Sequence, residues 1–427
     1  MIKSITLETA SRRALLLVAG FVCLLTTFFF VKWCFANAIA VRAPDRKVAE
    51  LAAALAPNDP QTHYALAVLN EKTFLAEDLS ESLAGFERAT ALAPHDFRLW
   101  LALGKARERR GDAAGAELAL RQALELAPNY APVQWTLGNI LLRRGKVEEA
   151  FTEIRRAAES SGIYRPATAA TAWQIFSGNL ADVKRHIGDS ANLNSALAVF
   201  LAKQKRFAEA VEIWNALPPL PPAGNLKTER RADGEELFNE LIAAKRYRDA
   251  QQIQSSLSNE SEAIEITPGK IVNGGFEADV KREKASVFEW QIGDGAQPQI
   301  GFDDREKLGG TRSLVIVFNS TNGKDFRQIS QTTTLASAGK YVFEIFYKSN
   351  LKTSAALRWE IVDAADDKVL ATTAALAENA DWTNLKTEFT VSEETQAVTV
   401  RLARAPCKSI ICPMTGKVWF DDFSIRQ

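Results

Sequence analysis

The segment FRLWLALGKARERRGDAAGAELALRQALELAPNY, residues 97–130, sets the architecture of the N-terminal half of the chain. Apolar and small residues recur in it at helical spacing, and the run RRGDAAGA divides it into two helices. The first helical face carries Trp100, Leu103 and Gly104, and the second carries Ala116, Leu120 and Ala123. Because small residues at Gly104 and Ala116 let the two backbones approach closely, the segment predicts a helix–turn–helix unit.

The boundary of this unit recurs along the chain. LAPND at Leu55, LAPHD at Leu92 and LAPNY at Leu126 are three copies of it, and their prolines lie 37 and 34 residues apart. A proline just past a helix end prevents the helix from continuing, and 34 residues is the period of a helix–turn–helix repeat. Because a further copy follows from residue 131 and a weaker one lies near residue 200, we expect an α-solenoid over residues 42–258.

The repeated unit resembles the tetratricopeptide repeat at its signature positions. This resemblance implies an array with a concave groove that binds a protein partner as an extended or helical peptide. On the inner helices, Trp100 and Trp135 are expected to serve packing. The contacts with the partner are expected from three polar side chains, Lys105, Arg109 and Asn139.

The N-terminal segment predicts a membrane anchor. Residues 14–31 contain no charged residue, and after Lys32 the chain stays uncharged to Val41. Since a membrane-spanning helix needs about 20 apolar residues, we expect residues 1–41 to form a cytoplasmic tip and a transmembrane anchor. The alternative is a cleaved signal peptide, because ANA at residues 36–38 resembles a cleavage site. Both alternatives export the rest of the chain.

After residue 270 the helical periodicity ends and short alternating strands begin. The run YVFEIFYK places Tyr341, Phe343, Ile345 and Tyr347 on one face, and LRWEI and VTVRL alternate in the same way. Many short strands with one apolar face are typical of an antiparallel β-sandwich. We expect a linker at residues 259–270 and a β-sandwich of the jelly-roll type at residues 271–427. The whole chain is then a multidomain α and β protein.

The landmarks of this β region resemble, in their order, the jelly-roll carbohydrate-binding modules of the cellulose- and xylan-binding kind, within the galactose-binding-like folds. VNGGFE opens the series and WFDD closes it. The resemblance implies binding of a polysaccharide, for which no cofactor is required. It also implies a structural calcium ion shared by Glu277 and Asp421 or Asp422, with backbone carbonyls or waters completing its 6–8 oxygen ligands. The alternative is a solvated Glu277 and an aspartate that caps a turn.

One strand face is a candidate surface for the sugar. Phe346 is a large aromatic residue on an otherwise polar face, and sugar sites combine an aromatic platform with polar groups. Polar residues on this and the neighbouring strands are expected to join it: Glu344, Arg358, Glu360, Arg401 and Gln331. The alternative is a solvated face of Glu–Arg pairs, which contributes little to stability.

Composition and motifs argue against two classes of function. The chain has 52 Lys and Arg against 52 Asp and Glu, and this balance argues against a nucleic-acid binder. Its 3 histidines are scattered, and it shows no phosphate loop or nucleophile elbow, so we do not expect an enzyme. The sequence favours a membrane-anchored envelope scaffold for surface polysaccharide assembly or export, whose repeats hold a protein while the β-sandwich contacts glycan. The alternatives are a pure protein-assembly factor with a structural β domain and, third, a glycan-processing enzyme.

The run PCKSIICP, residues 406–413, indicates the compartment. Zinc needs four ligands and a redox pair is usually Cys-x-x-Cys, whereas Cys407 and Cys412 are two thiols five positions apart. A disulfide and free thiols are the remaining alternatives, and two prolines that pin a short loop favour the disulfide. Disulfides persist in oxidising compartments. We therefore expect the N-terminus inside and the bulk of the chain extracytoplasmic, which is periplasmic in a Gram-negative bacterium.

Cys407 and Cys412 are expected to be oxidised in protein purified from its native compartment. A disulfide that closes so short a loop stabilises a fold by roughly 2 kcal/mol, so the pair should survive purification without reductant. Intact-mass analysis after alkylation should show no label at either position, and alkylation after reduction should show one at each. Two labelled thiols before reduction would contradict both the pairing and the topology drawn from it.

Overall fold

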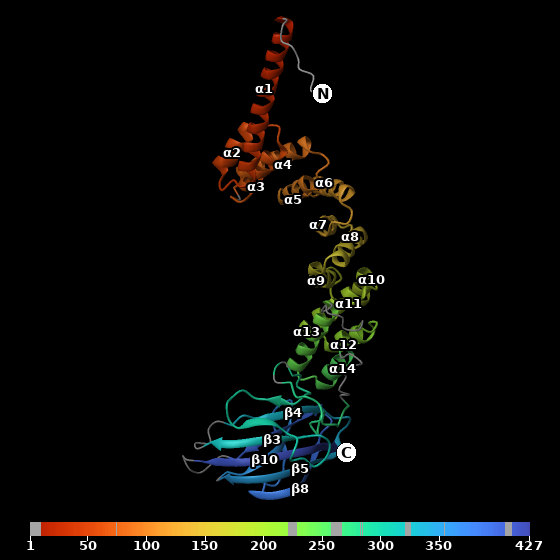
Figure 1. Ribbon diagram of the computed structural model, residues 1–427. Helices are drawn as coiled ribbons and strands as arrows, with labels where there is room; N and C mark the ends of the chain where they lie inside the picture. The colour runs from red at the N-terminus through yellow and green to blue at the C-terminus, as the bar shows by residue number, and fades with distance from the viewer. Residues whose placement is uncertain are drawn as a thin grey trace, which may run out of the picture. The chain divides into compact units, whose positions relative to one another are not determined.

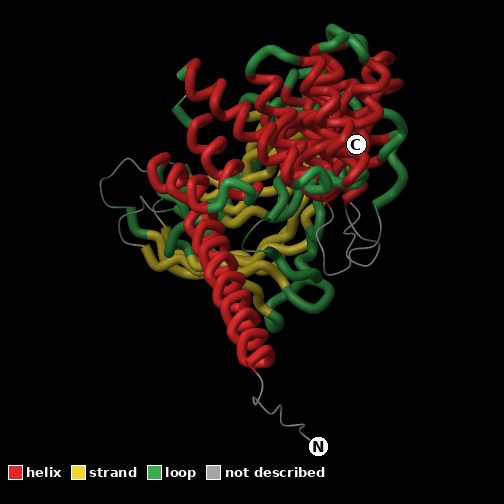
Figure 2. Tube along the Cα trace, turned by 90° about the horizontal axis from the view of Figure 1, so that it is seen from above, coloured by secondary structure: helices red, strands yellow, loops and turns green. Residues whose placement is uncertain are grey.

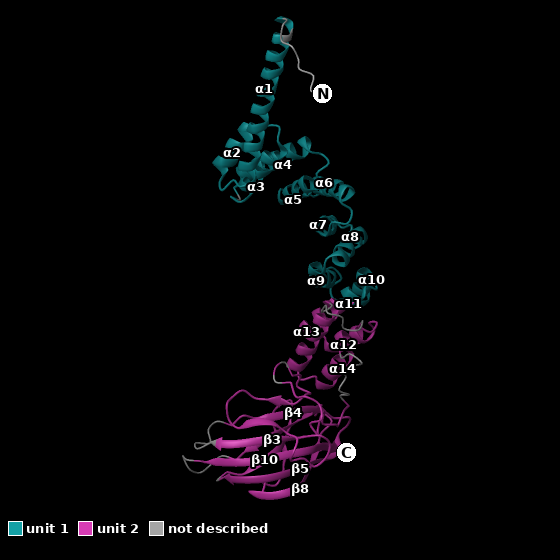
Figure 3. Cartoon of the chain, in the orientation of Figure 1, with its two compact units in different colours: residues 1–193 teal, residues 194–427 magenta. Residues whose placement is uncertain are grey.

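The computed structural model describes residues 10–73, 75–220, 229–257, 267–281, 283, 285–320, 326–353, 355–405 and 412–427. The chain forms two compact units, Met1–Leu193 and Asn194–Gln427, which Figure 3 colours separately. The described part of the first unit is helical, and the second contains helices followed by strands. The division falls within a helix, so the last helical pairs group with the strands and not with the earlier repeats.

Helices follow one another through the first unit and pack as neighbouring pairs (Figure 1). They are α1 (Ala10–Val41), α2 (Arg46–Leu55), α3 (Pro60–Glu71), α4 (Ala76–Leu92), α5 (Phe97–Arg109), α6 (Ala113–Leu126), α7 (Ala131–Arg143), α8 (Val147–Ser160), α9 (Arg165–Ile175) and α10 (Leu180–Ile187). A 3₁₀ turn, η1 (Gly162–Tyr164), precedes α9. The pairs α3–α4, α5–α6 and α7–α8 coincide with the three predicted repeats, which confirms the helix–turn–helix interpretation.

Close approach of the two helices explains the small residues in each repeat. A Cβ atom placed on Gly104 would lie 2.6 Å from Leu120 Cγ, and one on Gly138 would lie 2.5 Å from Ile154 Cγ1. Both distances are far below ordinary van der Waals contact. Only glycine at these two positions lets the apolar side chains of the second helix pack directly against the backbone of the first.

Each repeat boundary is held by a hydrogen bond to the carbonyl oxygen of its proline. His63 Nε2, Trp100 Nε1 and Gln134 Nε2 lie 2.8 Å from the carbonyl oxygens of the prolines six residues earlier, Pro57, Pro94 and Pro128. Each proline lies two residues beyond the end of the preceding helix, so its carbonyl oxygen has no partner within that helix. The fourth residue of the next helix therefore supplies the missing donor in all three boundaries.

The long helix α1 passes from an exposed apolar part into the packed array. Among the described residues, one helical span, Arg13–Val41, is long and apolar enough to cross a membrane. Its last turns pack on α2 and α3, where Ala36 and Ala40 are buried. Asn37 Nδ2 donates to Asp59 Oδ2 at 3.0 Å, and Asp59 Oδ1 caps the N-terminus of α3. One carboxylate thus joins α1 to the first repeat.

The second unit begins with helices and continues with strands. Its helices are α11 (Ala191–Lys203, which starts in the first unit), α12 (Phe207–Asn215), α13 (Glu229–Ala243) and α14 (Tyr247–Leu257). The described strands are β1 (Gln291–Ile292), β2 (Gln299–Asp303), β3 (Ser313–Ser320), β4 (Ile329–Thr334), β5 (Gly339–Thr353), β6 (Leu357–Asp363), β7 (Val369–Thr372), β8 (Asn379–Val391), β9 (Ala397–Arg404) and β10 (Met414–Arg426). Figure 2 shows these strands in yellow.

The strands form two five-stranded sheets, as predicted for a β-sandwich. Sheet I has the order β1-β4-β9-β6-β7 and sheet II has the order β2-β3-β10-β5-β8. The paired strands run antiparallel. Consecutive strands frequently lie in different sheets, and β5 and β6 are one such pair. This switching decides which outward residues share a surface.

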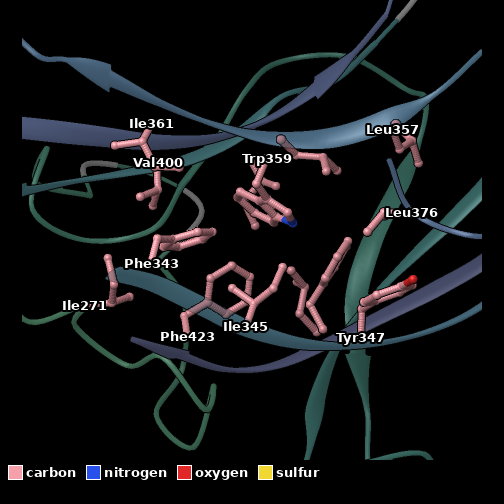
Figure 4. Close-up of a cluster of buried hydrophobic side chains, with 14 of the residues drawn as sticks. Ile271, Phe343, Ile345, Tyr347, Leu357, Trp359, Ile361, Leu376, Val400 and Phe423 are labelled. Atoms are coloured by element: carbon pink, nitrogen blue, oxygen red, sulfur yellow. The ribbon is translucent and has the colours of Figure 1, made fainter. Parts of the chain in front are cut away.

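Aromatic side chains fill the space between the two sheets (Figure 4). Trp359 of sheet I is fully buried, and its ring centroid lies 4.8 Å from that of Phe423 and 5.3 Å from that of Phe420, both on β10. Four alternate residues of β5 enter the same core, as the strand pattern predicted: Tyr341, Phe343, Ile345 and Tyr347. The positions between them consequently face outward.

A buried carboxylate, Glu117 of α6, joins two neighbouring repeats. Its side chain accepts hydrogen bonds from Arg121 Nε at 2.8 Å and Lys146 Nζ at 2.8 Å, and it also pairs with Arg144. Burial alone would raise the pKa of Glu117, but the hydrogen bonds from Lys146 and Arg121 lower it to about 2. The carboxylate is therefore held ionised at the junction between α6 and the turn from α7 to α8.

Replacing Glu117 by Gln should lower the free energy of unfolding of the first unit by about 3 kcal/mol, because three cations lose a buried acidic partner. The folded-state pKa lies below the unfolded value of 4.5, so the stabilisation is fully present above that pH and is lost as pH falls towards about 2. Urea unfolding followed by circular dichroism at several pH values measures this difference.

Glu149→Gln is the matched control for this prediction. Glu149 pairs with the same Arg121 at 2.5 Å, but its side chain is 54% exposed, so its removal should cost less than about 1 kcal/mol. Equal losses in the two variants, or a loss in Glu117→Gln that persists unchanged at pH 2, would show that the buried carboxylate has no special role.

Candidate functional site

Phe346 faces outward from sheet II, on the side of β5 opposite the core. It lies across from Asn384 of β8 and Asp421 of β10. Two strand neighbours, Glu344 and Lys348, share its outward face because they alternate with buried positions. A half-buried aromatic ring with polar neighbours is therefore present where the sequence predicted it.

Glu344, beside Phe346, is held by three side-chain partners. It accepts a hydrogen bond from Asn384 Nδ2 at 2.5 Å and pairs with Lys386 at 2.9 Å and Arg426 at 3.7 Å. The hydrogen bonds from Asn384 and Lys386 lower the pKa of Glu344. The carboxylate is thus ionised and held in place, while the partner lysine and arginine are exposed and can turn to a ligand.

The predicted single sugar surface is wrong, because its residues lie on two different sheets. Arg358 and Glu360 are on β6 and Arg401 is on β9, and both strands belong to sheet I, whereas Phe346 belongs to sheet II. On sheet I these three form their own cluster, in which Glu360 pairs with Arg358 at 3.3 Å and with Arg401 at 3.1 Å. This cluster matches the alternative of a face of Glu–Arg pairs.

The prediction that Gln331 joins the sugar surface is also wrong. Its side chain is fully buried, and its position on β4 pairs with the core residue Val400. The amide accepts from Val272 N at 2.7 Å and donates to Val272 O at 2.9 Å. Gln331 therefore fixes the segment that opens the β-sandwich and is not available to a ligand.

The tryptophans of the β-sandwich divide between its core and its surface. Trp290 and Trp359 are core residues. Trp419 lies between the core residues Val418 and Phe420, so it faces outward on sheet II, and this alternation was readable in the sequence. The residue is nevertheless only 9% exposed, and Nε1 donates to Asp303 Oδ2 at 3.0 Å. Trp419 supports the sheet surface but offers little ring area to a sugar.

The predicted calcium ligands hold a loop by hydrogen bonds. Asp421 Oδ2 accepts from the backbone N–H groups of Leu308 and Gly309 at 3.0 and 3.3 Å. Both oxygens of Glu277 accept from Thr311 N at 3.0 Å. Burial raises the pKa of Asp421, although these backbone donors act against the shift.

This donor set does not fit a calcium ion as it stands. N–H groups occupy the carboxylate oxygens that a cation would use, and the described residues contain no group of three acidic, histidine or cysteine side chains that could hold a metal. Asp422 lies beside Asp421, and its Oδ1 atom is 3.8 Å from the position that a Cβ atom would take on Gly275. Among the described residues, Asp422 does not complete a group of three side chains that could hold a metal. Calcium binding at Glu277, Asp421 and Asp422 stays a prediction that the geometry does not support.

The predicted partner residues of the array lie on a face crossed by ion pairs between repeats. Arg109 of α5 pairs with Glu71 of α3, and Arg143 of α7 pairs with Glu108 of α5 at 2.8 Å. These pairs recur at equivalent positions of successive repeats, so α3, α5 and α7 share one face. Arg109 is therefore already committed to the array itself.

Lys105 and Asn139 lie one helical turn before Arg109 and Arg143, on that same face. Lys105 is half-buried and forms no ion pair with any described residue. Asn139 Nδ2 donates to Trp135 O at 2.9 Å, within its own helix. Trp100 bonds to Pro94 and Trp135 stacks on Tyr164 with centroids 5.0 Å apart, consistent with the packing roles expected of them.

The predicted disulfide cannot be placed, because Cys407 lies outside the described residues. Cys412 is buried, and its carbonyl oxygen accepts from Arg404 Nη2 at 2.6 Å. The pairing of the two cysteines stays a prediction.

Comparisons with known proteins agree with the helical repeats. The tetratricopeptide repeat family matches residues 97–130. No curated protein sequence matches the chain. A crystal structure of MamA is 12% identical with a TM-score of 0.27 and covers 47% of this chain and 90% of its own. A crystal structure of YrrB, a TPR protein with an unusual peptide-binding site, is 13% identical with a TM-score of 0.26 and covers 49% and 90%.

A CBM4 structure is similar to another part of the chain. It is 16% identical with a TM-score of 0.27 and covers 36% of this chain and 97% of its own. Likenesses at these TM-scores carry no argument about what the chain binds. The repeat match and the two antiparallel sheets together establish a tetratricopeptide repeat array followed by a β-sandwich.

Proposed function

We propose that this chain is a non-enzymatic, membrane-anchored scaffold with its bulk on the extracytoplasmic side. The observation that supports a retained anchor is the packing of the last turns of α1 on α2 and α3, through Ala36, Asn37 and Ala40. The preceding turns expose large apolar side chains, among them Phe21, Phe28 and Phe30. A bilayer would cover those side chains, while the packed end of the helix already belongs to the array.

This packing favours an uncleaved anchor over a signal peptide. Cleavage after Ala38 would remove Ala36 and Asn37, which are part of the packed first repeat. Asp59, which is only 2% exposed, would then lose the donor that Asn37 supplies. A buried acceptor left without its partner costs about 1–3 kcal/mol. A signal peptide that is cleaved off is not expected to form part of the packing of the mature protein.

The repeats are proposed to bind a protein partner on the face that α3, α5 and α7 share. The tetratricopeptide match supports a role in protein–protein interaction. The ion pairs Glu71–Arg109 and Glu108–Arg143 keep the three helices in register. Lys105 and Asn139 lie beside these pairs, so they are the contact residues we propose, whereas Arg109 supports the surface.

The outward face of sheet II is proposed to contact glycan. Phe346 offers an apolar ring, and Glu344, Lys348 and Asn384 around it offer hydrogen-bonding groups for sugar hydroxyls. The cluster on sheet I has no described aromatic residue facing outward beside it, because Trp359 points into the core. Sheet II is therefore the better candidate.

A scaffold with a protein-binding and a glycan-binding surface would suit the assembly or export of a surface polysaccharide. In the alternative, the β-sandwich is structural and the chain is a protein-assembly factor. A glycan-processing enzyme is the third candidate, and the adjacent carboxylates Asp421 and Asp422 give it little support, since Asp421 is buried and bonded to backbone N–H groups.

Retention of α1 tests the anchor. Protein extracted from the membrane of its native host should have the intact mass of the whole chain and should resist extraction with alkaline carbonate. In a variant whose 4 natural cysteines are replaced by serine, an impermeant thiol reagent should label Gln252→Cys on intact cells and leave Ser4→Cys unlabelled. A mature chain that begins after residue 38, or labelling of Ser4→Cys alone, would reject this proposal.

Phe346→Ala tests the glycan surface. The solubilised chain is run in native gels that contain soluble polysaccharides of different composition. Loss of ring stacking should weaken binding to a retarding polymer by about three- to tenfold. Arg358→Ala, on sheet I, is the control and should bind as the unmodified chain does. No retardation by any polymer would favour the protein-assembly factor, and weakening by Arg358→Ala alone would move the site to sheet I.

A further inference from the structure

The turn between α13 and α14 inserts its side chains into one end of the β-sandwich. Tyr247 Oη donates to Ala364 O at 2.7 Å, and Lys245 Nζ donates to Ala365 O. Arg248 Nε donates to Leu335 O at 3.0 Å. The acceptors are backbone carbonyls of loops that follow β4 and β6, so one side chain of the α13–α14 connection and two from the first turn of α14 hold two loops of sheet I.

Further contacts along the helices extend this junction. Gln251 Oε1 accepts from Thr334 Oγ1, and Gln254 Oε1 accepts from Ser286 Oγ at 2.5 Å. Gln251 and Thr334 are both buried. Phe238 of α13 packs edge-on against Phe288, with ring centroids 6.2 Å apart. The junction is therefore an ordered polar interface with an aromatic contact, and all its residues lie within the second compact unit.

Two of the residues that make these contacts, Tyr247 and Arg248, are particular to the last helical pair. In four pairs, the second residue beyond the end of the first helix is in the left-handed conformation, at Gly111, Gly145, Lys205 and Lys245, and the α9–α10 pair has two such residues, Ser177 and Gly178. Arg248 is the third residue after Lys245. The third residues after Gly111, Gly145 and Lys205 are Ala114, Glu148 and Ala208.

The position of Tyr247 is held by Ala113, Val147 and Phe207, none of which has a hydroxyl group. The turn of the last pair thus combines the ordinary geometry of the repeat with a tyrosine hydroxyl and an arginine guanidinium at two positions where those earlier pairs have neither. Lys245 stands where two earlier pairs have glycine and keeps the left-handed conformation at φ 60°, although that conformation favours glycine. Lys205 holds the same position and conformation in an earlier pair, so what is particular to the last pair is the bond from Lys245 Nζ to Ala365 O.

We infer that the β-sandwich is the C-terminal cap of the repeat array and that it unfolds together with α13 and α14 as one cooperative unit. A repeat array needs a terminal element that covers its last repeat, and the loops of sheet I supply that cover. The sandwich is then held at a fixed orientation to the last helical pair. This role does not depend on whether the sandwich binds glycan.

Hydrogen exchange measured by mass spectrometry on the full chain tests the inference. Arg248→Ala removes the donor to Leu335, and its loss should speed exchange about tenfold or more in peptides of α14 and, by a similar factor, in peptides of β4 and β9. Peptides of α5 to α8 should exchange as before. Tyr247→Phe removes one hydroxyl and should cause a smaller, equally shared increase, which keeps the test valid if Arg248→Ala folds poorly.

Gln252→Ala is the matched control for Gln251→Ala. The two glutamines are neighbours on α14, but Gln251 is buried at the junction and Gln252 is exposed. Gln251→Ala should speed exchange in α14 and β4 together, and Gln252→Ala should change neither. Faster exchange confined to α14, with the strands of sheet I unchanged in both Arg248→Ala and Tyr247→Phe, would overturn the inference.

Discussion

The same hydrogen bond to the carbonyl oxygen of a proline recurs at three boundaries of the helical array and joins each pair to the next. An imidazole, an indole and a carboxamide supply the donor to Pro57, Pro94 and Pro128, each at 2.8 Å. The side chains differ in size and chemistry, yet each reaches from the same position of the following helix. The bond ties the end of one pair to the start of the next through residues only six apart in the chain.

The array could be predicted from sequence because the interactions that define it are local. Gly104 and Leu120 lie in one repeat, and the proline and its donor are six residues apart. The ion pairs between repeats were harder to foresee. Arg109 carries a charge that looks free in the sequence, and its partner Glu71 lies 38 residues away. A pattern of single residues cannot show that two such positions meet, so the availability of Arg109 to a partner was overestimated.

The β-sandwich was predictable as a fold and only partly as a site. Alternation shows which residues share a side of one strand, and it correctly separated Phe346 from the core of β5. Alternation contains no information about which sheet the next strand joins. It therefore could not show that Glu360 lies on the other sheet. Gln331 was misjudged for a related reason, since the backbone of Val272 that it bonds lies 59 residues away. Long-range pairing is a property of the assembled sandwich.

The uninterrupted course of α1 has a mechanical consequence for the proposed anchor. The helix runs from Ala10 to Val41 without a proline, and a residue in a helix rises about 1.5 Å, so its 32 residues exceed a bilayer core of about 30 Å. The surplus turns are those packed on α2 and α3. A helix longer than the hydrocarbon layer tilts as the layer thins. With no hinge between the span and the packed turns, such a tilt would act as a lever that turns α2 and α3 with it, making the first repeat responsive to bilayer thickness.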